Sequence, residues 1–92
     1  MEKKLGGTAL VQNNASEFFL EYYLTENDTH NYAVQIEKKE ESESGLVLRE
    51  DYTSKYIIDG EDNANELLKL LVKNSVTPAT AESVLQDLGY FE

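Results

Sequence analysis

The chain has 92 residues and a net charge of −10, because 18 acidic side chains outnumber eight basic ones. This length supports a single hydrophobic core, which a hydrophobic content of 40% is sufficient to fill. The charge disfavours direct binding to nucleic acid or anionic membranes, and the absence of cysteine excludes disulfides and zinc–thiolate sites.

Residues 1–16 are small, polar and glycine-containing, and we predict a flexible arm there, followed by one domain over residues 17–92. The apolar patch Ala9-Leu10-Val11 leaves open that the arm adds an edge strand. The first residues lack the apolar core of a secretory signal, and no apolar run reaches membrane-spanning length. The expected location is therefore the cytoplasm.

An alternating pattern beginning at Glu17 predicts a strand with one buried face and one half-buried face. Phe19 and Tyr23 lie on the half-buried face. Polar turn residues 26–31 follow, and a second alternating run over residues 32–37 completes a hairpin. The residues of the buried face are Phe18, Leu20, Tyr22 and Leu24.

Residues 38–44 are charged and contain serine, which predicts a loop ending at Gly45. Residues 46–52 return to a β-like composition and are expected to form a third strand. Residues 55–58 are apolar and β-branched, so they either continue that strand beyond a bend or form a fourth, short strand.

Two amphipathic helices are predicted in the last third of the chain. Asp59 fits the N-cap of a helix over residues 60–73, with Leu70 outside its apolar stripe. Asn74 is a candidate for a left-handed residue after this helix, and Thr77-Pro78 for the start of the second, which Gly89 ends. The apolar stripes are Ala64, Leu67, Leu68, Leu71 and Val72, then Ala81, Val84, Leu85 and Leu88.

The expected fold class is therefore α+β, with an antiparallel sheet of three or four strands followed by two short helices packed on one face. Each helix has one apolar stripe that must be buried, and the apolar face of the hairpin provides the surface for both.

The sequence offers no catalytic, cofactor-binding or metal-binding residue. His30, the only histidine, falls in a polar hairpin turn, where a solvated role is expected instead of acid–base catalysis. No serine lies in a nucleophile elbow. The acidic run Asp59-Gly60-Glu61-Asp62-Asn63 lacks the glycine and glutamate spacing of a calcium loop, and a helix start explains it better.

Aromatic side chains provide the one candidate surface. Phe19 and Tyr23 lie opposite the predicted core face and, with Arg49 or Tyr52, form a possible protein-binding patch. The alternative is that the N-terminal arm, or a second copy in a homodimer, covers them.

Three segments carry a family resemblance: Glu21-Tyr22-Tyr23-Leu24, Tyr32-Ala33-Val34-Gln35-Ile36, and Asn74-Ser75-Val76-Thr77-Pro78 with Val84 and Asp87. Together they resemble a family of small uncharacterised domains from Gram-positive bacteria, over about residues 17–91. Ala81, Ser83 and Ala33 depart from its usual residues. The resemblance implies a helper or regulatory protein of the bacterial cytoplasm and supplies no catalytic residues.

The leading hypothesis is a small acidic domain that is not an enzyme and acts in protein interaction or regulation, with an unidentified protein partner. The alternative is an acidic mimic of nucleic acid that inhibits a DNA- or RNA-binding protein, since the charge of −10 is large for 92 residues.

Overall fold

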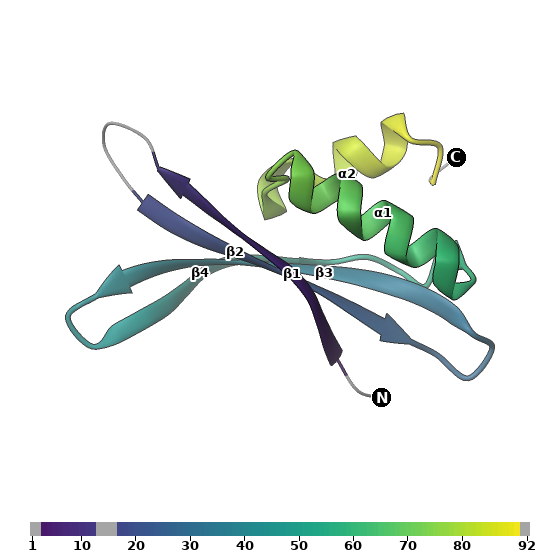
Figure 1. Cartoon of the computed structure of the whole chain (residues 1–92), viewed down its shortest axis with the longest axis horizontal. Coiled ribbons are helices and arrows are strands. Elements are labelled where there is room, and N and C mark those ends of the chain that lie inside the picture. The colour runs from purple at the N-terminus through teal and green to yellow at the C-terminus, as the bar shows by residue number, and fades with distance from the viewer. Residues whose placement is uncertain (1–2, 13–16, 91–92) are drawn as a thin grey trace.

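The computed structural model describes residues 3–12 and 17–90. Four antiparallel strands follow one another in the order β1-β2-β3-β4, and the short β5 pairs with β3. Both helices lie on one side of the twisted sheet, as Figure 1 shows. The predicted α+β fold is confirmed. The elements are β1 (Lys3–Gln12), β2 (Glu17–Glu26), β3 (Asn31–Ser42), β4 (Gly45–Thr53), β5 (Ile58–Asp59), α1 (Glu61–Lys73) and α2 (Pro78–Asp87).

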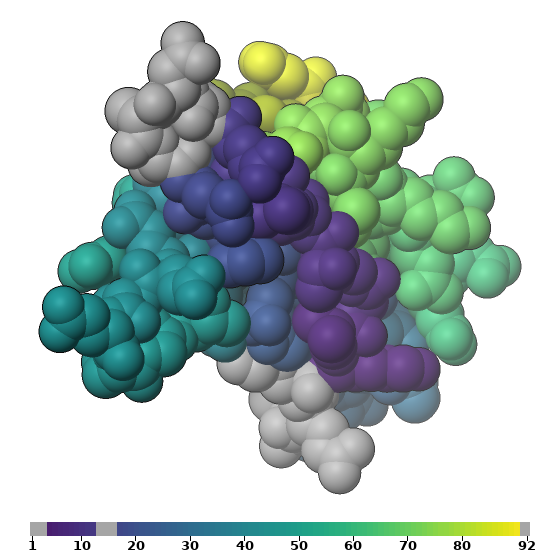
Figure 2. Space-filling view, turned by 60° about the vertical axis from the view of Figure 1, so that its left-hand side comes forward, coloured from purple at the N-terminus to yellow at the C-terminus, as the bar shows by residue number. Residues whose placement is uncertain are grey.

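The flexible arm predicted for residues 1–16 was wrong over the residues described, because Lys3–Gln12 form the edge strand β1, which pairs with β2. The predicted arm also includes residues 1–2 and 13–16, which lie outside the described residues. Figure 2 shows β1 along the surface beside the helices. Gly6 and Gly7 let α1 approach closely: a Cβ on Gly7 would lie 2.7 Å from Val72 Cγ2, and one on Gly6 would collide with Leu68. These glycines lower β propensity, which hid the strand.

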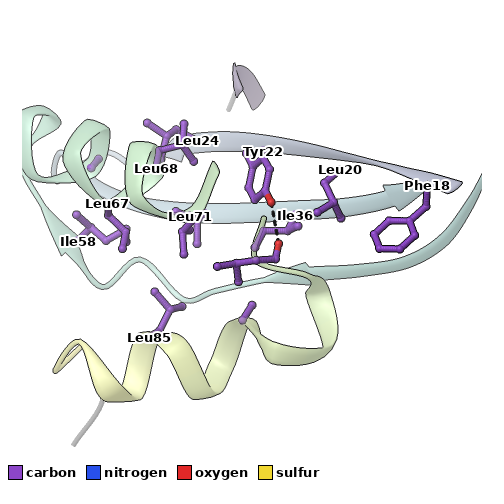
Figure 3. Packing of buried hydrophobic residues seen from close by; sticks show 14 residues of the cluster. Phe18, Leu20, Tyr22, Leu24, Ile36, Ile58, Leu67, Leu68, Leu71 and Leu85 are labelled. Atoms are coloured by element: carbon purple, nitrogen blue, oxygen red, sulfur yellow. Dashed lines mark hydrogen bonds between the residues drawn. The ribbon is translucent and has the colours of Figure 1, made fainter. Parts of the chain in front are cut away.

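The core lies between the sheet and the helices (Figure 3). The alternation predicted in β2 is confirmed, since Phe18, Leu20, Tyr22 and Leu24 are all buried. Tyr22 donates a hydrogen bond of 2.9 Å from its hydroxyl to the carbonyl of Val76, between the two helices. A hydroxyl buried among apolar groups needs such a partner. Burial of each large side chain stabilises the fold by roughly 1.5–3 kcal/mol.

The loop predicted for residues 38–44 was mostly wrong, because β3 continues to Ser42 and only a tight turn separates it from Gly45. Its charged side chains pair with other strands: Lys38 Nζ lies 3.3 Å from Glu50 Oε1, and Lys39 Nζ lies 2.6 Å from Glu21 Oε1. Cross-strand pairing makes these charges compatible with a strand. The β3–β4 hairpin projects beyond the helices (Figure 1).

The structure decides between the two alternatives for residues 55–58. β4 ends at Thr53, and the separate strand β5 begins at Ile58 and pairs with Asn31 and Tyr32 of β3. Between them, buried Ser54 forms two hydrogen bonds with the backbone of Val34. Ser54 N–H donates to the Val34 carbonyl at 2.9 Å, and the Ser54 hydroxyl accepts from Val34 N–H at 3.0 Å.

Two predicted cap residues of α1 are each displaced by one position. The N-cap is Gly60 instead of Asp59, since the backbone has φ 89° there and glycine takes this conformation without strain. At the other end the left-handed residue is Ser75, with φ 50°, instead of Asn74. Val76 N–H then donates to the Leu71 carbonyl at 3.0 Å, which closes the helix end.

The predictions for α2 are confirmed at both ends. Thr77 is the N-cap with Pro78 in the first turn, although no side-chain hydrogen bond caps this end. Gly89 has φ 88°, and Tyr90 N–H donates to the Leu85 carbonyl at 3.0 Å. Ala81 and Leu85 bury the inner side of the helix.

Candidate functional site

The side of the sheet away from the helices, here called the open face, carries side chains from all four long strands. Within the described residues, no helix packs against it (Figure 1). The strand register assigns residues to this face, because directly opposite residues point the same way. It includes Leu5, Thr8 and Leu10 of β1, Phe19, Glu21 and Tyr23 of β2, Gln35, Glu37 and Lys39 of β3, and Leu46, Leu48 and Asp51 of β4.

An apolar row, defined as Leu10, Phe19 and Leu48, crosses the open face. Leu10 lies opposite Phe19, Phe19 opposite Lys39, and Lys39 opposite Leu48. Leu10 is 52% exposed and Leu48 50% exposed, while Phe19 is half-buried between them. Large exposed apolar side chains gathered on one surface are typical of a protein-binding site.

An acidic row, defined as Glu21, Glu37 and Asp51, lies beside the apolar row. Glu21 is opposite Glu37, and Glu37 is opposite Asp51. Lys39 reaches into this row, with Nζ 2.6 Å from Glu21 Oε1 and 3.5 Å from Glu37 Oε1. Glu37 is only 8% exposed although no helix covers its face, because Gln35 and Lys39 pack around its carboxylate. Gln35 Nε2 donates to Glu37 Oε2 at 3.1 Å.

The hydrogen bonds of the acidic row extend to Tyr23, whose hydroxyl donates to Glu21 Oε1 at 2.8 Å. Burial, and then this bond to the Glu21 carboxylate, raise the pKa of Tyr23. The bond from Lys39 to Glu21 raises the pKa of Lys39. Tyr23 is therefore neutral and Lys39 charged at neutral pH, and the row is a fixed arrangement of donors and acceptors.

The structure brings together only two of the four residues predicted for the protein-binding patch. Phe19 and Tyr23 share the open face. Tyr52 is opposite Ile36 and points to the helices. Burial raises the pKa of Tyr52, and the nearby Glu82 of α2 raises it further. Arg49 is the extra residue of a bulge in β4, and its Nε lies 3.4 Å from Glu40 Oε2. The bulge shifts the alternation in β4, so sequence spacing alone could not decide whether Arg49 or Tyr52 shares the face of Phe19.

Sequence reasoning also missed Leu10 and Leu48 as members of the surface. Their signal was present in the alternation of each strand, but β1 was predicted to be a loose arm, and the bulge at Arg49 concealed which face Leu48 occupies. The cross-strand register was needed to show that both lie in one row with Phe19, Leu10 directly opposite it and Leu48 beyond Lys39.

Two hollows lie beside the helices. One, of about 420 Å³, opens between the end of β1 and α1 and is lined by residues that include Leu24, Tyr32, Glu26 and Glu61. Burial raises the pKa of Tyr32, and the nearby carboxylates of Glu26 and Glu61 raise it further. The second, of about 280 Å³, lies between α1 and α2, beside Leu70 and Leu88.

Within residues 3–12 and 17–90, no group of three or more acidic or histidine side chains is placed to hold a metal ion. His30 lies in the β2–β3 turn, as predicted, with φ 63° and its Nδ1 2.7 Å from Glu26 Oε2. It is 84% exposed, so its surroundings are water and one carboxylate.

A family of unknown function, DUF6514, has a model that matches residues 1–89. The chain belongs to this family. The expected membership of an uncharacterised family is thus confirmed, and the match includes β1, which the resemblance over residues 17–91 had left out. No curated protein and no solved structure matches this DUF6514 chain significantly. None of its described helices has the length and apolar character needed to cross a membrane.

Proposed function

We propose that this DUF6514 chain is a protein-binding module without enzymatic activity, and that the open face is its binding surface. The observation that carries the proposal is the apolar row, in which Leu10 and Leu48 each leave about half of their surface in water. Covering these side chains with a partner removes apolar surface from water at about 25 cal/mol per Å². The cytoplasmic location and bacterial origin expected from the sequence belong to the same proposal.

Comparison with the helices supports this choice of surface. The exposed leucines of the helical side, Leu70 and Leu88, are 39% and 43% exposed, less than Leu10 and Leu48, and lie with Tyr90 around one hollow between the helices. The open face instead places Leu10 and Phe19 directly opposite each other on β1 and β2, and Leu48 on β4 beyond Lys39 of β3. Rigid apolar anchors favour binding because little side-chain entropy is lost.

Mimicry of nucleic acid receives less support from the arrangement of charge. Among the described residues, carboxylates lie on the open face at Glu37, on the helix-bearing face near Glu50, and on both helices, for example at Glu66 and Glu82. This spread is typical of a solvated acidic surface, whereas a mimic needs one extended row of charge.

Affinity capture with matched variants tests the proposed function. The wild-type chain, Leu10→Ser/Leu48→Ser and the control Leu70→Ser/Leu88→Ser are used as bait in extracts of cells that naturally contain the chain. Each variant replaces two exposed leucines with serines, so nonspecific hydrophobic binding to the bait falls by a similar amount in both. We expect the same specific proteins with wild type and control, and their loss with the open-face variant. Identical recovery with all three baits would contradict the proposal.

A further inference from the structure

The sheet ends in two outer strands, β1 and β4, and the helices obstruct one of them. At β1, α1 packs against Gly6 and Gly7 through Leu68 and Val72, and the register is irregular between Leu5 and Gly7. Another copy that approached β1 would bring its own helices against α1. The first half of β4 instead belongs to the hairpin that projects beyond both helices (Figure 1). The accessible end of the sheet is therefore at β4.

The outer backbone edge of β4 has no strand to pair with. Within residues 3–12 and 17–90, β3 is the only strand that pairs with β4. An edge strand directs N–H and C=O groups outward at alternate residues, and a further extended chain pairs with them in a regular ladder. Residues 45–48 carry no charged side chain, and Leu46 and Leu48 are 55% and 50% exposed. The bulge at Arg49 ends this regular stretch, which is therefore short and apolar.

We infer that a second copy of the chain supplies the next strand, and that the two β4 strands pair antiparallel about a two-fold axis at Val47. The segment Leu46-Val47-Leu48 reads the same in both directions, so each leucine of one copy lies opposite a leucine of the other. Val47 then lies opposite Val47 of the second copy. A two-fold interface needs a surface that is complementary to itself, and this segment is one.

Other registers do not match the residues of β4 in this way. Shifting the second copy by two residues places Leu48 opposite Ser44 in the turn, or Leu46 opposite the charged Glu50. Shifting it by one residue moves its side chains to the other face of the sheet. The register centred on Val47 pairs every leucine with a leucine and keeps all four on the same face.

The homodimer joins the open faces of two copies into one surface. Directly opposite residues point to the same face, so the apolar row continues from Leu48 to Leu46 of the second copy. The sequence left open a homodimer in which a second copy covers Phe19 and Tyr23. Pairing at the edge instead leaves both of these residues uncovered. The homodimer thus goes beyond the proposed function, because the second copy adds residues to the proposed binding surface.

The net charge of −10 on each copy opposes the homodimer and makes it depend on salt. Residues 45–48 carry no charge, so the repulsion acts between charges elsewhere on the two copies. Salt screens such charges beyond roughly 8 Å at about 0.15 M and beyond roughly 3 Å at about 1 M. A contact through one short strand also buries less surface than a standard interface. We therefore expect a weak dimer that becomes tighter as salt is raised.

A single introduced cysteine tests which residues meet at the axis, because the chain has no cysteine of its own. Val47→Cys places two thiols on directly opposite residues, whose Cα atoms lie about 4.5–5.5 Å apart in an antiparallel pair, within the range of a disulfide. Leu10→Cys is the control on the other outer strand, and its greater exposure favours chance collisions. With oxidised glutathione we expect the Val47→Cys chain to form the linked dimer at least about tenfold faster than the control.

Two lysine variants test the same edge without a new covalent bond. Leu46→Lys places a charge opposite Leu48 of the second copy, and lysine on an edge strand is a common obstacle to pairing. Leu5→Lys is the control on β1, where the leucine is 52% exposed. Both variants change the net charge from −10 to −9, so neither increases the repulsion between copies. By sedimentation equilibrium in about 1 M salt, we expect Leu46→Lys to raise the dissociation constant of the dimer at least about tenfold, and Leu5→Lys less than about twofold.

Three outcomes would overturn the inference. One is a chain that stays monomeric at about 1 mM in high salt, which is also the result if β4 pairs only with a strand of another protein. The others are equally fast linking of the two cysteine variants, and equal weakening by the two lysine variants, because the copies would then meet elsewhere. These measurements use the purified chain alone, so their failure leaves the proposed function, which is tested by partner capture, unaffected.

Discussion

Neighbouring residues of β2 face opposite sides of the same sheet, and their surroundings differ sharply. On the helix-bearing face, Leu20 and Tyr22 have no exposed surface, and the hydroxyl of Tyr22 donates to a backbone carbonyl. On the open face, the hydroxyl of Tyr23 donates to a carboxylate, and the leucine nearest Phe19 is half exposed. One face is organised to exclude water, whereas the other holds apolar groups and charges at the surface. The first face stabilises the fold, and the second is the face for which we propose binding.

The largest contrast is expected between two leucines on adjacent strands, Leu20 and Leu10. Leu20→Ala removes a fully buried side chain and leaves a cavity, so we expect the free energy of unfolding to fall by about 2–5 kcal/mol. Leu10→Ala removes a side chain that is 52% exposed, and we expect less than about 1 kcal/mol. Urea unfolding at neutral pH measures both. Similar losses would mean that the open face also supports the fold.

Alkaline pH should act mainly through the buried face. Burial raises the pKa of Tyr22 from 10.0 to about 12. Between these values the unfolded chain releases the proton while the folded chain keeps it, so stability is complete below pH 10 and falls as pH rises. The loss approaches roughly 3 kcal/mol by pH 12, at 1.36 kcal/mol per pH unit.

Unfolding curves at several pH values between 9 and about 12 would reveal this dependence. Tyr22→Phe should remove the largest part of the slope, and Tyr23→Phe should remove less. A residual slope is expected in both, because the pKa values of Tyr32 and Tyr52 are also raised, mainly by burial. An unchanged slope in Tyr22→Phe would show that its hydroxyl is not withdrawn from water.

At neutral pH the same tyrosines provide a smaller comparison. Tyr22→Phe deletes the donor to the buried Val76 carbonyl, 2.9 Å away, and should cost about 1–3 kcal/mol. Tyr23→Phe deletes a donor to Glu21, a carboxylate that also binds Lys39 and is partly reached by water, and should cost under about 1 kcal/mol. Thermal unfolding of both variants decides this. The opposite order would mean that the acidic row contributes more stability than the core hydrogen bond.

The difference between the two faces also explains which parts of the fold and of the site the sequence predicted. Alternation in β2 and the apolar stripe of α1 predicted the buried side, because the hydrophobic effect determines which residues are inside. The strand at Lys3–Gln12 was missed, because Gly6 and Gly7 were read as flexibility although they permit close packing against α1. The site depended on cross-strand register, because the bulge at Arg49 shifts the alternation of β4 and only the register shows that Tyr52 lies on the helix-bearing face.

Only a small change in stability is expected for Leu10→Ser/Leu48→Ser. Surface substitutions usually change the free energy of unfolding by less than about 0.5 kcal/mol, and these leucines contribute somewhat more because each buries half of its surface. We expect a total loss below about 1.5 kcal/mol, with higher solubility, measured by urea unfolding and precipitation. A loss comparable to that of Leu20→Ala would contradict the proposed role, because the apolar row would then be needed for folding. A small loss together with abolished partner recovery would show that these two leucines remain exposed for binding.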